Sequence, residues 1–382
     1  MNKLRIMVST TFGVEAIVKK ELRKLNYNVE RVKNGRIEFE GTAEDLARVN
    51  LHLRAAERVY LKLAEFTARD FDELYDQVNE LEWQDLIPYK GKFPVKGKSS
   101  KSQLHNVPAC QSIIKKSIVD KLQSKYGEGR LPETGETYPV NFMINKDRVI
   151  IALDASGTGL HKRGYRQEAG PAPIKETIAA AMIYLSKWNR DRILIDPFCG
   201  SGTILIEAAL MARKIAPGLN RDFVSEDWAF LPENLYDEMR TEARDKIWTE
   251  AEPRMLAGYD QDQRSVKQAI YNSRRAGVEE MIHFQQQELA DFSTNRKYGY
   301  IISNPPYGER MAEDEVRELY ELMGNKFLPL DTWSFYILTA HSDFEKYFGK
   351  EASKRRKLYN GGLECQFYQY YGPWPPSDGS DY

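Results

Sequence analysis

The second half of the chain alternates short apolar runs with polar stretches of helical periodicity, and this pattern constrains the fold more than any other feature. The apolar runs lie at residues 192–195, 256–259, 281–286, 299–303 and 334–339. Residues 203–214 and 263–276 have helical periodicity, and residues 215–254 read as an insertion with a helix of its own. Such alternation from about residue 172 onward predicts a parallel sheet with crossover helices.

The last of these strands is followed by a hairpin signal. Residues 356–359 and 364–370 flank Asn360-Gly361-Gly362, which predicts an antiparallel pair at the edge of the sheet. The expected fold class is therefore α/β, with a doubly wound, Rossmann-like sheet closed by an antiparallel edge. Sheets of this kind bind ligands at the carboxyl ends of their strands.

The first half predicts two smaller α+β units. Expected strands are 3–9, two short strands around Asn34-Gly35, 59–66, 138–144 and 148–153. Expected helices are 12–25, 42–56 with a capping box at Thr42, 70–81 and 107–125. Residues 88–102 read as a loop, and the glycine- and proline-rich stretch after Ser156 reads as a linker. The expected domains are 1–57, 58–155, a linker at 156–171 and a catalytic domain at 172–382.

Composition narrows the class of protein. The 382 residues are 42% hydrophobic and 29% charged, which is typical of a globular protein of two or three domains. No apolar run is long enough for a membrane-spanning helix, and the N-terminus does not resemble a signal peptide. Cys110, Cys199 and Cys365 are widely spaced, which favours a reducing cytoplasm over a disulfide framework. The five histidines form no metal-binding spacing, so we expect no metal.

Basic residues cluster locally although the formal net charge is only −1. One cluster lies in a Gly/Ser/Pro-rich stretch around residues 90–101, a second spans residues 161–166, and a third spans 354–357. A solvated surface is the ordinary explanation of any single cluster. The residues expected to contact nucleic acid are Lys92, Lys96, Lys98, Lys101, Lys162, Arg163 and Arg166.

A glycine-rich turn follows the first strand of the expected sheet, in the sequence Asp196-Pro197-Phe198-Cys199-Gly200-Ser201-Gly202-Thr203. Two glycines allow the backbone to approach a ligand closely. The third glycine of a dinucleotide-binding fingerprint is absent. Asp196 is suited to an ammonium group, which the methionine end of S-adenosylmethionine has and NAD lacks. A structural turn is the alternative for this motif alone.

Acidic residues follow the next two strands. Asp260 can accept hydrogen bonds from a ribose diol, and Asp262 is either a substitute for it or the N-cap of the following helix. Glu288 and Leu289 are expected to border an adenine ring. The sequence therefore predicts a nucleoside-containing cofactor at this edge of the sheet.

The strand at 299–303 runs directly into Asn304-Pro305-Pro306-Tyr307. An exocyclic base amine is a poor nucleophile because its lone pair is delocalised into the ring. The Asn304 side-chain oxygen and the Pro305 carbonyl can each accept one of its N–H groups, and two prolines hold these acceptors in place. Tyr307 offers a ring for stacking an extruded base. A proline-rich turn that merely ends a strand is the alternative, and a cytosine-C5 enzyme is excluded because this loop lacks a cysteine.

With these residues assembled, the chain resembles the THUMP-domain RNA methyltransferases, and more narrowly the bacterial 23S rRNA guanine-N2 methyltransferases, which are often described as N6-adenine-specific DNA methylases. The resemblance covers essentially the whole chain. It rests on residues 172–176, the turn at 196–203 with the helix after it, Ala216-Pro217-Gly218-Leu219, residues 303–310 and residues 357–361. Residues 160–166 match a family segment between the THUMP and catalytic domains.

The resemblance implies a ferredoxin-like N-terminal subdomain, a THUMP domain over about 44–155 and a class I methyltransferase domain. It implies S-adenosylmethionine as cofactor and RNA as partner, either 23S rRNA or an assembling large-subunit particle. The expected cofactor-binding residues are Asp196, Phe198, Cys199, Gly200, Ser201, Gly202, Thr203, Asp260, Gln261, Glu288, Leu289 and Asn304. The larger relatives carry a second methyltransferase domain, whereas this chain ends at Tyr382, so only the first of their two activities is carried over.

Two other functions remain open. An adenine-N6 methyltransferase acting on RNA or DNA would use the same Asn-Pro-Pro-Tyr pocket. RNA is favoured because the extra residues precede the catalytic domain and contain no evident DNA-reading helix. A non-catalytic RNA-binding assembly factor is the third reading, and intact Asp196, Asp260 and Asn304 argue against it.

Overall fold

The computed structural model describes residues 3–33, 35–127, 129–166, 174–249, 255–307 and 312–376, and these form two compact units. The first unit contains residues up to 10, 19–160 and 221–242, and the second contains 11–18, 161–220 and residues from 243 onward. Neither unit is a continuous piece of chain. The predicted division at residues 156–171 therefore misses residues 221–242, which lie within the expected catalytic domain but pack with the N-terminal unit.

The first unit is built on a seven-stranded sheet of order β2-β3-β1-β4-β7-β6-β5. Its strands are β1 (Leu4–Ser9), β2 (Arg31–Lys33), β3 (Arg36–Gly41), β4 (Arg58–Thr67), β5 (Val95–Ser100), β6 (Val140–Asn145) and β7 (Arg148–Asp154). All neighbouring pairs are antiparallel except β5 and β6, which run parallel. Lys146 and Asp147 both have positive φ in the predicted β6–β7 turn. Asn34, in the other predicted turn, lies outside the described residues.

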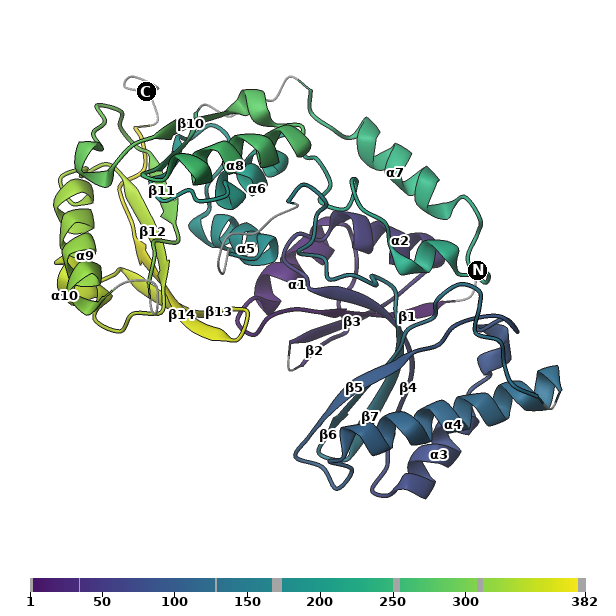
Figure 1. Ribbon diagram of the computed structural model, residues 1–382. Helices are drawn as coiled ribbons and strands as arrows, with labels where there is room; N and C mark the ends of the chain where they lie inside the picture. The colour runs from purple at the N-terminus through teal and green to yellow at the C-terminus, as the bar shows by residue number, and fades with distance from the viewer. Residues whose placement is uncertain are drawn as a thin grey trace. The chain divides into compact units, whose positions relative to one another are not determined.

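The helices of this unit are α1 (Glu15–Lys24), which continues into it from the second unit, α2 (Ala43–His52), α3 (Phe71–Asn79) and α4 (Val107–Tyr126). α2 packs against β3 and β4, and α3 and α4 pack together beside β5 (Figure 1). The predicted capping box at Thr42 is present, since its hydroxyl accepts from the Asp45 amide and the Asp45 carboxylate accepts from the Thr42 amide. The helix ends at His52, four residues earlier than expected.

β5 corrects the prediction of a loop at residues 88–102. The strand carries Lys96, Gly97 and Lys98 where a buried strand would carry branched apolar residues, so the sequence lacks a strand signal. It lies at the sheet edge, where one side of the backbone stays unpaired and lysines are well tolerated.

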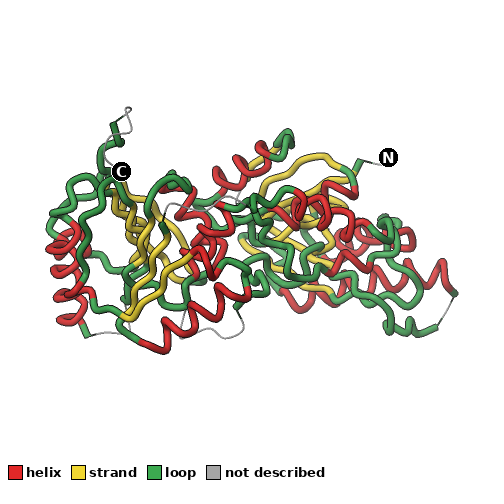
Figure 2. The backbone as a smooth tube through the Cα atoms, turned by 90° about the horizontal axis from the view of Figure 1, so that it is seen from above, coloured by secondary structure: helices red, strands yellow, loops and turns green. Residues whose placement is uncertain are grey.

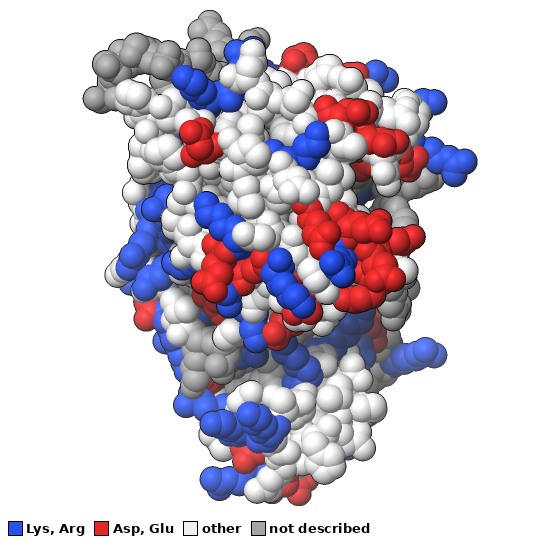
Figure 3. All heavy atoms as spheres, turned by 90° about the vertical axis from the view of Figure 1, so that its left-hand side faces the viewer, with Lys and Arg blue, Asp and Glu red and all other residues white. Residues whose placement is uncertain are grey.

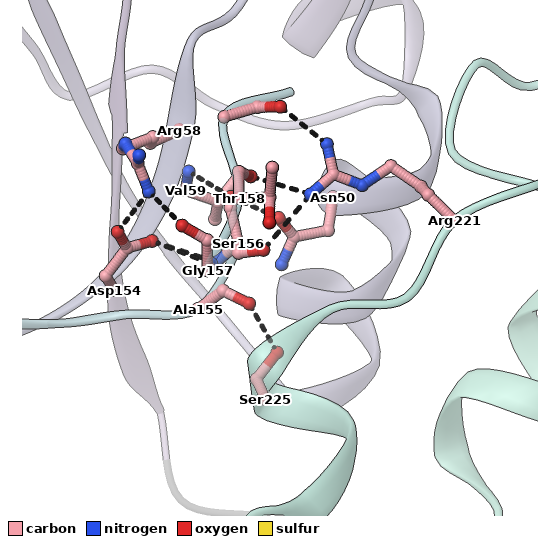
Figure 4. Close-up of polar contacts among 11 residues, drawn as sticks. Asn50, Arg58, Val59, Asp154, Ala155, Ser156, Gly157, Thr158, Arg221 and Ser225 are labelled. Atoms are coloured by element: carbon pink, nitrogen blue, oxygen red, sulfur yellow. Dashed lines mark hydrogen bonds and ion pairs between the residues drawn. The ribbon is translucent and has the colours of Figure 1, made fainter. Parts of the chain in front are cut away.

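Residues 221–242 are fixed to the first unit by a buried arginine. The Arg221 guanidinium donates to the carbonyls of Ser156, Thr158 and Gly159 at distances of 3.2, 2.6 and 2.7 Å. Figure 4 shows the Arg221 side chain reaching into this loop, which follows β7. Ser225 adds a hydrogen bond of 2.9 Å from its hydroxyl to the Ala155 carbonyl. This polar network holds a segment of the predicted catalytic domain against the N-terminal sheet.

The second unit contains a seven-stranded sheet of order β10-β9-β8-β11-β12-β14-β13. Its strands are β8 (Leu194–Asp196), β9 (Leu256–Asp260), β10 (Ile282–Gln286), β11 (Tyr300–Ser303), β12 (Ser334–Thr339), β13 (Lys354–Asn360) and β14 (Leu363–Tyr370). β10, β9, β8, β11 and β12 are parallel, and β14 pairs antiparallel with β12 and β13. The doubly wound sheet with a hairpin edge is confirmed.

Helices cover both faces of this sheet (Figure 2). They are α5 (Glu176–Ser186), α6 (Thr203–Ala212), α8 (Gln263–Arg275), α9 (Glu313–Phe327) and α10 (Phe344–Phe348), whereas most of α7 (Leu235–Asp245) lies in the first unit. The aromatic core between the sheet and α9 and α10 includes Tyr320, Phe327, Phe335 and Phe344. The sequence did not predict α5, α9 or α10. No helix among the described residues is both long and apolar enough to cross a membrane.

Candidate active site

The parallel strands of the second unit end at one edge of their sheet, and a cavity of about 820 Å³ lies there. β8 ends at Asp196 and β9 at Asp260, while Glu288 and Asn304 follow β10 and β11. All four of these side chains come from separate parts of the sequence and line the same cavity. The expected position of the site, at the carboxyl ends of the strands, follows from the parallel order of these strands.

The glycine turn forms one wall of the cavity. Gly200 has φ of +51° and Gly202 has φ of +79°, a region that other residues enter only with strain. A Cβ atom on Gly202 would also lie 3.0 Å from the Ala269 side chain, so this position serves helix packing as well. The Gly200 amide donates to the Asp260 carboxylate at 2.9 Å, which ties the turn to the end of β9.

Asp196 is a buried carboxylate with no basic partner among the described residues. It is 2% exposed and accepts hydrogen bonds from the Ser303 hydroxyl at 2.5 Å and the Phe198 amide at 3.1 Å. Burial raises the pKa of Asp196 to about 7, and the nearby Asp260 adds to the shift. An ammonium group in the cavity would stabilise the ionised form, so the environment suits the role predicted for this residue.

Asp260 and Asp262 occupy different environments. Asp260 lines the cavity, and burial raises its pKa. Asp262 is exposed and caps α8, where its carboxylate accepts from the Arg264 amide at 3.0 Å. Of the two expected ribose ligands, Asp260 therefore faces the cavity. Asp262 has the position of the helix cap that the sequence also allowed.

Most of the other predicted cofactor residues also line the cavity. These are Phe198, Cys199, Ser201, Thr203, Gln261, Glu288 and Leu289. Gly202 lies behind the wall, at the N-cap of α6. Burial raises the pKa of Cys199, which fits a packed thiol better than a nucleophile.

Asn304 brings an unsatisfied acceptor to this site. Its Oδ1 atom is buried and has no hydrogen-bond partner among the described residues, which is unusual for a buried polar atom. Asn304 and Pro306 line the cavity. An oxygen held in this way can accept an N–H group from a bound molecule.

Pro305 and Tyr307 are not among the lining residues. Tyr307 is only 8% exposed, and its hydroxyl lies 3.6 Å from Cys365 Sγ. This buried position does not support the predicted stacking of a base on the Tyr307 ring. Residues 308–310, which complete the motif, lie outside the described residues.

Sequence reasoning missed several residues that shape the cavity. Ser303 donates to Asp196, and its place directly before Asn304 in a buried strand was the available signal. The side chains contributed by α9 had no such signal because the helix itself was not predicted. The lining residues missed are Ile174, Pro197, Ile204, Ser265, Gln268, Gln287, Ala290, Glu315, Glu318, Leu319 and Leu322.

The basic residues expected to bind nucleic acid divide into two groups. Lys92, Lys96, Lys98 and Lys101, in or near β5, are exposed, as is Lys162. Arg163 is not: its side chain is 2% exposed and its Nε atom lies 3.4 Å from the Glu207 carboxylate. Arg166 is 11% exposed and pairs with Glu176 at 2.9 Å. Both arginines are held inside the second unit by these contacts, which does not favour the predicted contact of Arg163 and Arg166 with RNA.

Comparison with known families identifies three regions of the chain. Residues 5–60 match the RlmL ferredoxin-like domain, residues 68–154 match the THUMP domain, and residues 163–369 match the RMKL-like methyltransferase domain. These matches confirm the predicted family and fold class.

Individual relatives support the same family assignment. The chain is 47% identical to YpsC of Bacillus subtilis (strain 168), named as an RNA methyltransferase, over 98% of each chain. It is 33% identical to ribosomal RNA large subunit methyltransferase K/L of Syntrophotalea carbinolica over 96% of this chain and 53% of that protein, so it spans about half the length of that relative. The crystal structure of SMU.472, described as a methyltransferase in complex with SAH, has a TM-score of 0.92 and 44% identity over 98% of this chain and 100% of that one. The chain therefore belongs to the family of RMKL-like methyltransferases that carry RlmL ferredoxin-like and THUMP domains.

Proposed function

We propose that this protein is an S-adenosylmethionine-dependent RNA methyltransferase that modifies the exocyclic N2 of a guanine in 23S rRNA. The observation that carries the proposal is the buried, unsatisfied Oδ1 of Asn304 at the wall of a cavity that also contains Asp196 and Asp260. The names of the relatives support RNA as the substrate class, and the complex of SMU.472 with SAH supports the cofactor.

The residues of the cavity fit this donor. When bound, S-adenosylmethionine supplies an electrophilic methyl group on a positively charged sulfur. Asp196 would hold the ammonium group, Asp260 the ribose hydroxyls, and Glu288 and Leu289 the edge of the adenine. The described lining residues include five carboxylates, from Asp196, Asp260, Glu288, Glu315 and Glu318, and no Lys or Arg. A negative cavity favours a donor of net positive charge over its neutral product.

The acceptor amine would be activated by the loop after β11. The Asn304 oxygen would accept one N–H and so direct the nitrogen lone pair toward the methyl group, while the Pro305 carbonyl, which is not among the lining residues, could accept the second N–H only from behind the wall. Asn304 is held in place before the substrate arrives, since two prolines restrict the loop and β11 is buried on both sides. A base inside a duplex cannot reach such a pocket, so the target guanine is unpaired or extruded.

Binding of the RNA is assigned to the first unit and to Lys162. The THUMP domain carries Lys92, Lys96, Lys98 and Lys101 along or beside an exposed edge strand, where they can contact successive phosphates. α9 of the second unit is unsuited to this role. Figure 3 looks onto the side of that unit that carries α9 and shows acidic side chains gathered there. The exposed acidic residues of α9 are Glu313, Asp314, Glu315, Glu318 and Glu321.

Nucleoside analysis of 23S rRNA tests the proposal directly. RNA from cells that lack the gene is digested and compared with RNA from cells complemented with the wild-type gene or with Asn304→Ala. We expect loss of one N2-methylguanosine per 23S rRNA in the deletion strain, restored by the wild-type gene and not by Asn304→Ala. Loss of N6-methyladenosine instead would assign the pocket to adenine, and an unchanged nucleoside profile would reject 23S rRNA as substrate.

A further inference from the structure

Residues 161–166 form a basic segment that the structure places beside the cofactor cavity. Arg163 lies against α6 through its contact with Glu207, which is fully buried. The Tyr165 hydroxyl lies 3.3 Å from the same carboxylate. The segment therefore packs directly beside the helix that begins at the glycine turn, and the charges of Arg163 and Arg166 are directed into the unit, whereas Lys162 is exposed.

Arg166 contacts two residues of the cavity wall. Its Nη1 atom donates to the Ile174 carbonyl at 3.1 Å and to the Thr203 hydroxyl at 3.4 Å, while Nη2 donates to Glu176 at 2.9 Å. Ile174 and Thr203 both line the cavity. The guanidinium thus lies one residue behind the wall, at the point where α6 begins.

The carboxylate of S-adenosylmethionine would be stabilised by a positive charge near the cavity wall. The methionine end of S-adenosylmethionine carries a carboxylate next to its ammonium group, and the described lining residues offer carboxylates but no cation. Thr203 and Ile204 bring the first turn of α6 to the cavity, and the free amides of a helix N-terminus attract an anion. Arg166, in contact with the Thr203 hydroxyl, adds a full positive charge at the same place.

Glu176 only partly offsets this charge. Burial raises the pKa of Glu176 to about 7, so part of the population carries a neutral carboxyl near neutral pH. The positive potential of Arg166 at the cavity wall is correspondingly greater than that of a fully neutralised ion pair.

We propose that Arg166 is a positioning residue for the amino-acid end of S-adenosylmethionine. It holds Ile174 and Thr203 in place and supplies the charge opposite the methionine carboxylate. This inference rests on the use of S-adenosylmethionine and is independent of which base, or which RNA, accepts the methyl group.

A pair of ligands that differ only in the carboxylate tests it. S-adenosylhomocysteine and decarboxylated S-adenosylhomocysteine are titrated by calorimetry into the full-length wild-type protein and into Arg166→Gln. We expect Arg166→Gln to weaken S-adenosylhomocysteine about tenfold, because a full positive charge directly behind the cavity wall is lost, and to weaken the decarboxylated ligand less than about twofold. Such a difference measures coupling between Arg166 and the carboxylate itself.

Two further variants serve as a second test and as a control. Arg166→Lys keeps the charge but cannot reach both wall residues in the same way, so we expect a smaller loss that is still confined to the ligand with the carboxylate. If Arg166→Gln does not fold, this variant carries the test. Lys162→Gln removes an exposed charge from the same segment and is expected to change neither affinity.

Several outcomes would overturn the proposal. Equal losses for both ligands would show that Arg166 only maintains the shape of the unit, and no loss for either would show that it plays no part in binding. Reduced RNA affinity with unchanged S-adenosylhomocysteine affinity would return the segment to an RNA-binding role. Because every readout is ligand binding, a wrong assignment of the methylated base would leave these results unaffected.

Discussion

Asn304 carries the proposed chemistry at the scale of a single residue. Asn304→Ala removes the buried side-chain acceptor and leaves the rest of the cavity intact. We expect the single-turnover rate of methyl transfer to fall by about 10²-fold or more, as for loss of one fixed hydrogen-bonding group in an active site. The affinity for S-adenosylhomocysteine, measured by calorimetry, should change less than about twofold.

Asn304→Asp is the matched control, because it retains a side-chain oxygen acceptor at the same position. It should keep more activity than Asn304→Ala. Full activity of Asn304→Ala would reject the assigned mechanism, and a large loss of cofactor affinity would place Asn304 in the binding of the donor instead.

The raised pKa of Asp196 implies that the affinity for the cofactor depends on pH. Burial raises the pKa of Asp196 to about 7, so the unliganded protein takes up a proton here as the pH falls through about 7. An ammonium group favours the ionised carboxylate. The affinity for S-adenosylhomocysteine should therefore rise between pH 6 and pH 8, with net proton release at the lower pH in calorimetry.

Asp196→Asn should remove this dependence and lower the affinity. Glu176 also has a pKa raised to about 7, and its ionisation offsets Arg166, which works in the opposite direction. A dependence that persists in Asp196→Asn would therefore assign the titration to another group. The stability of the unliganded protein changes in the opposite direction from the cofactor affinity. Because the pKa of buried Asp196 is raised, the free energy of unfolding falls as the pH rises through about 7.

The sequence predicted the main residues of the site but not their surroundings. Asp196, Asp260 and Asn304 could be placed together because each follows a parallel strand, and the ends of parallel strands meet at one edge. Arg163 and Arg166 could not be placed, since their burial depends on Glu207 and Glu176, which nothing in the basic run indicates. A run of charges gives local composition and not the direction in which each side chain points.

At the scale of the element, the pairing of β5 with β6 requires a glycine at position 97. A Cβ atom on Gly97 would lie 2.3 Å from the Phe142 carbonyl oxygen of the neighbouring strand, too close for either backbone to keep its place. Gly97→Ala should lower the free energy of unfolding by about 1–3 kcal/mol in urea titrations. Gly362→Ala, where a Cβ meets no atom within 4 Å, is the control and should change it little.

Two of the elements missed from the sequence, β5 and α5, have a physical reason. β5 has polar residues and a glycine because it is an edge strand, and α5 is too evenly apolar to show an amphipathic stripe, with nine of its eleven residues buried. Strands with strong alternation, and helices with clear caps such as α2 and α3, were placed within a few residues. The sequence therefore identified strands bounded by turn signals, including the fully buried β11 and β12, and helices with clear caps. It failed for β5, which is polar, and for α5, which is almost uniformly apolar.

The packing of residues 221–242 on the first unit depends on the hydrogen bonds of Arg221. Arg221→Ala would leave the carbonyls of Ser156, Thr158 and Gly159 without this donor, and we expect it to lower the free energy of unfolding by about 3 kcal/mol. Tryptophan fluorescence in urea follows the change, because Trp228 lies in this segment. Glu238→Ala, an exposed position on α7, should be neutral, and an equal effect of both variants would contradict the anchoring role.

At the scale of the whole molecule, RNA binding and chemistry are assigned to different units. Replacing Lys96 and Lys98 by alanine should weaken RNA binding and reduce the slope of log K against log salt by about 1.5, the value for two phosphate contacts. The affinity for S-adenosylhomocysteine should not change. Exposed Lys20 and Lys125, on α1 and α4, provide a control double substitution with the same loss of charge.

If both lysine pairs have the same effect on RNA binding, the edge strand has no special role and only net charge matters. A loss of cofactor affinity in the Lys96 and Lys98 variant would contradict the assignment of the two tasks to separate units. RNA affinity is measured by filter binding at several salt concentrations.

The chain order of the two units bears on how this protein is made. Translation delivers the residues in sequence, and the first unit includes 221–242, which follow the turn at 196–203 of the second unit. The first unit therefore cannot be completed while only the strands of its sheet have left the ribosome. Its last piece emerges with most of the cofactor cavity still unsynthesised, so neither unit can be finished before synthesis of the other has begun.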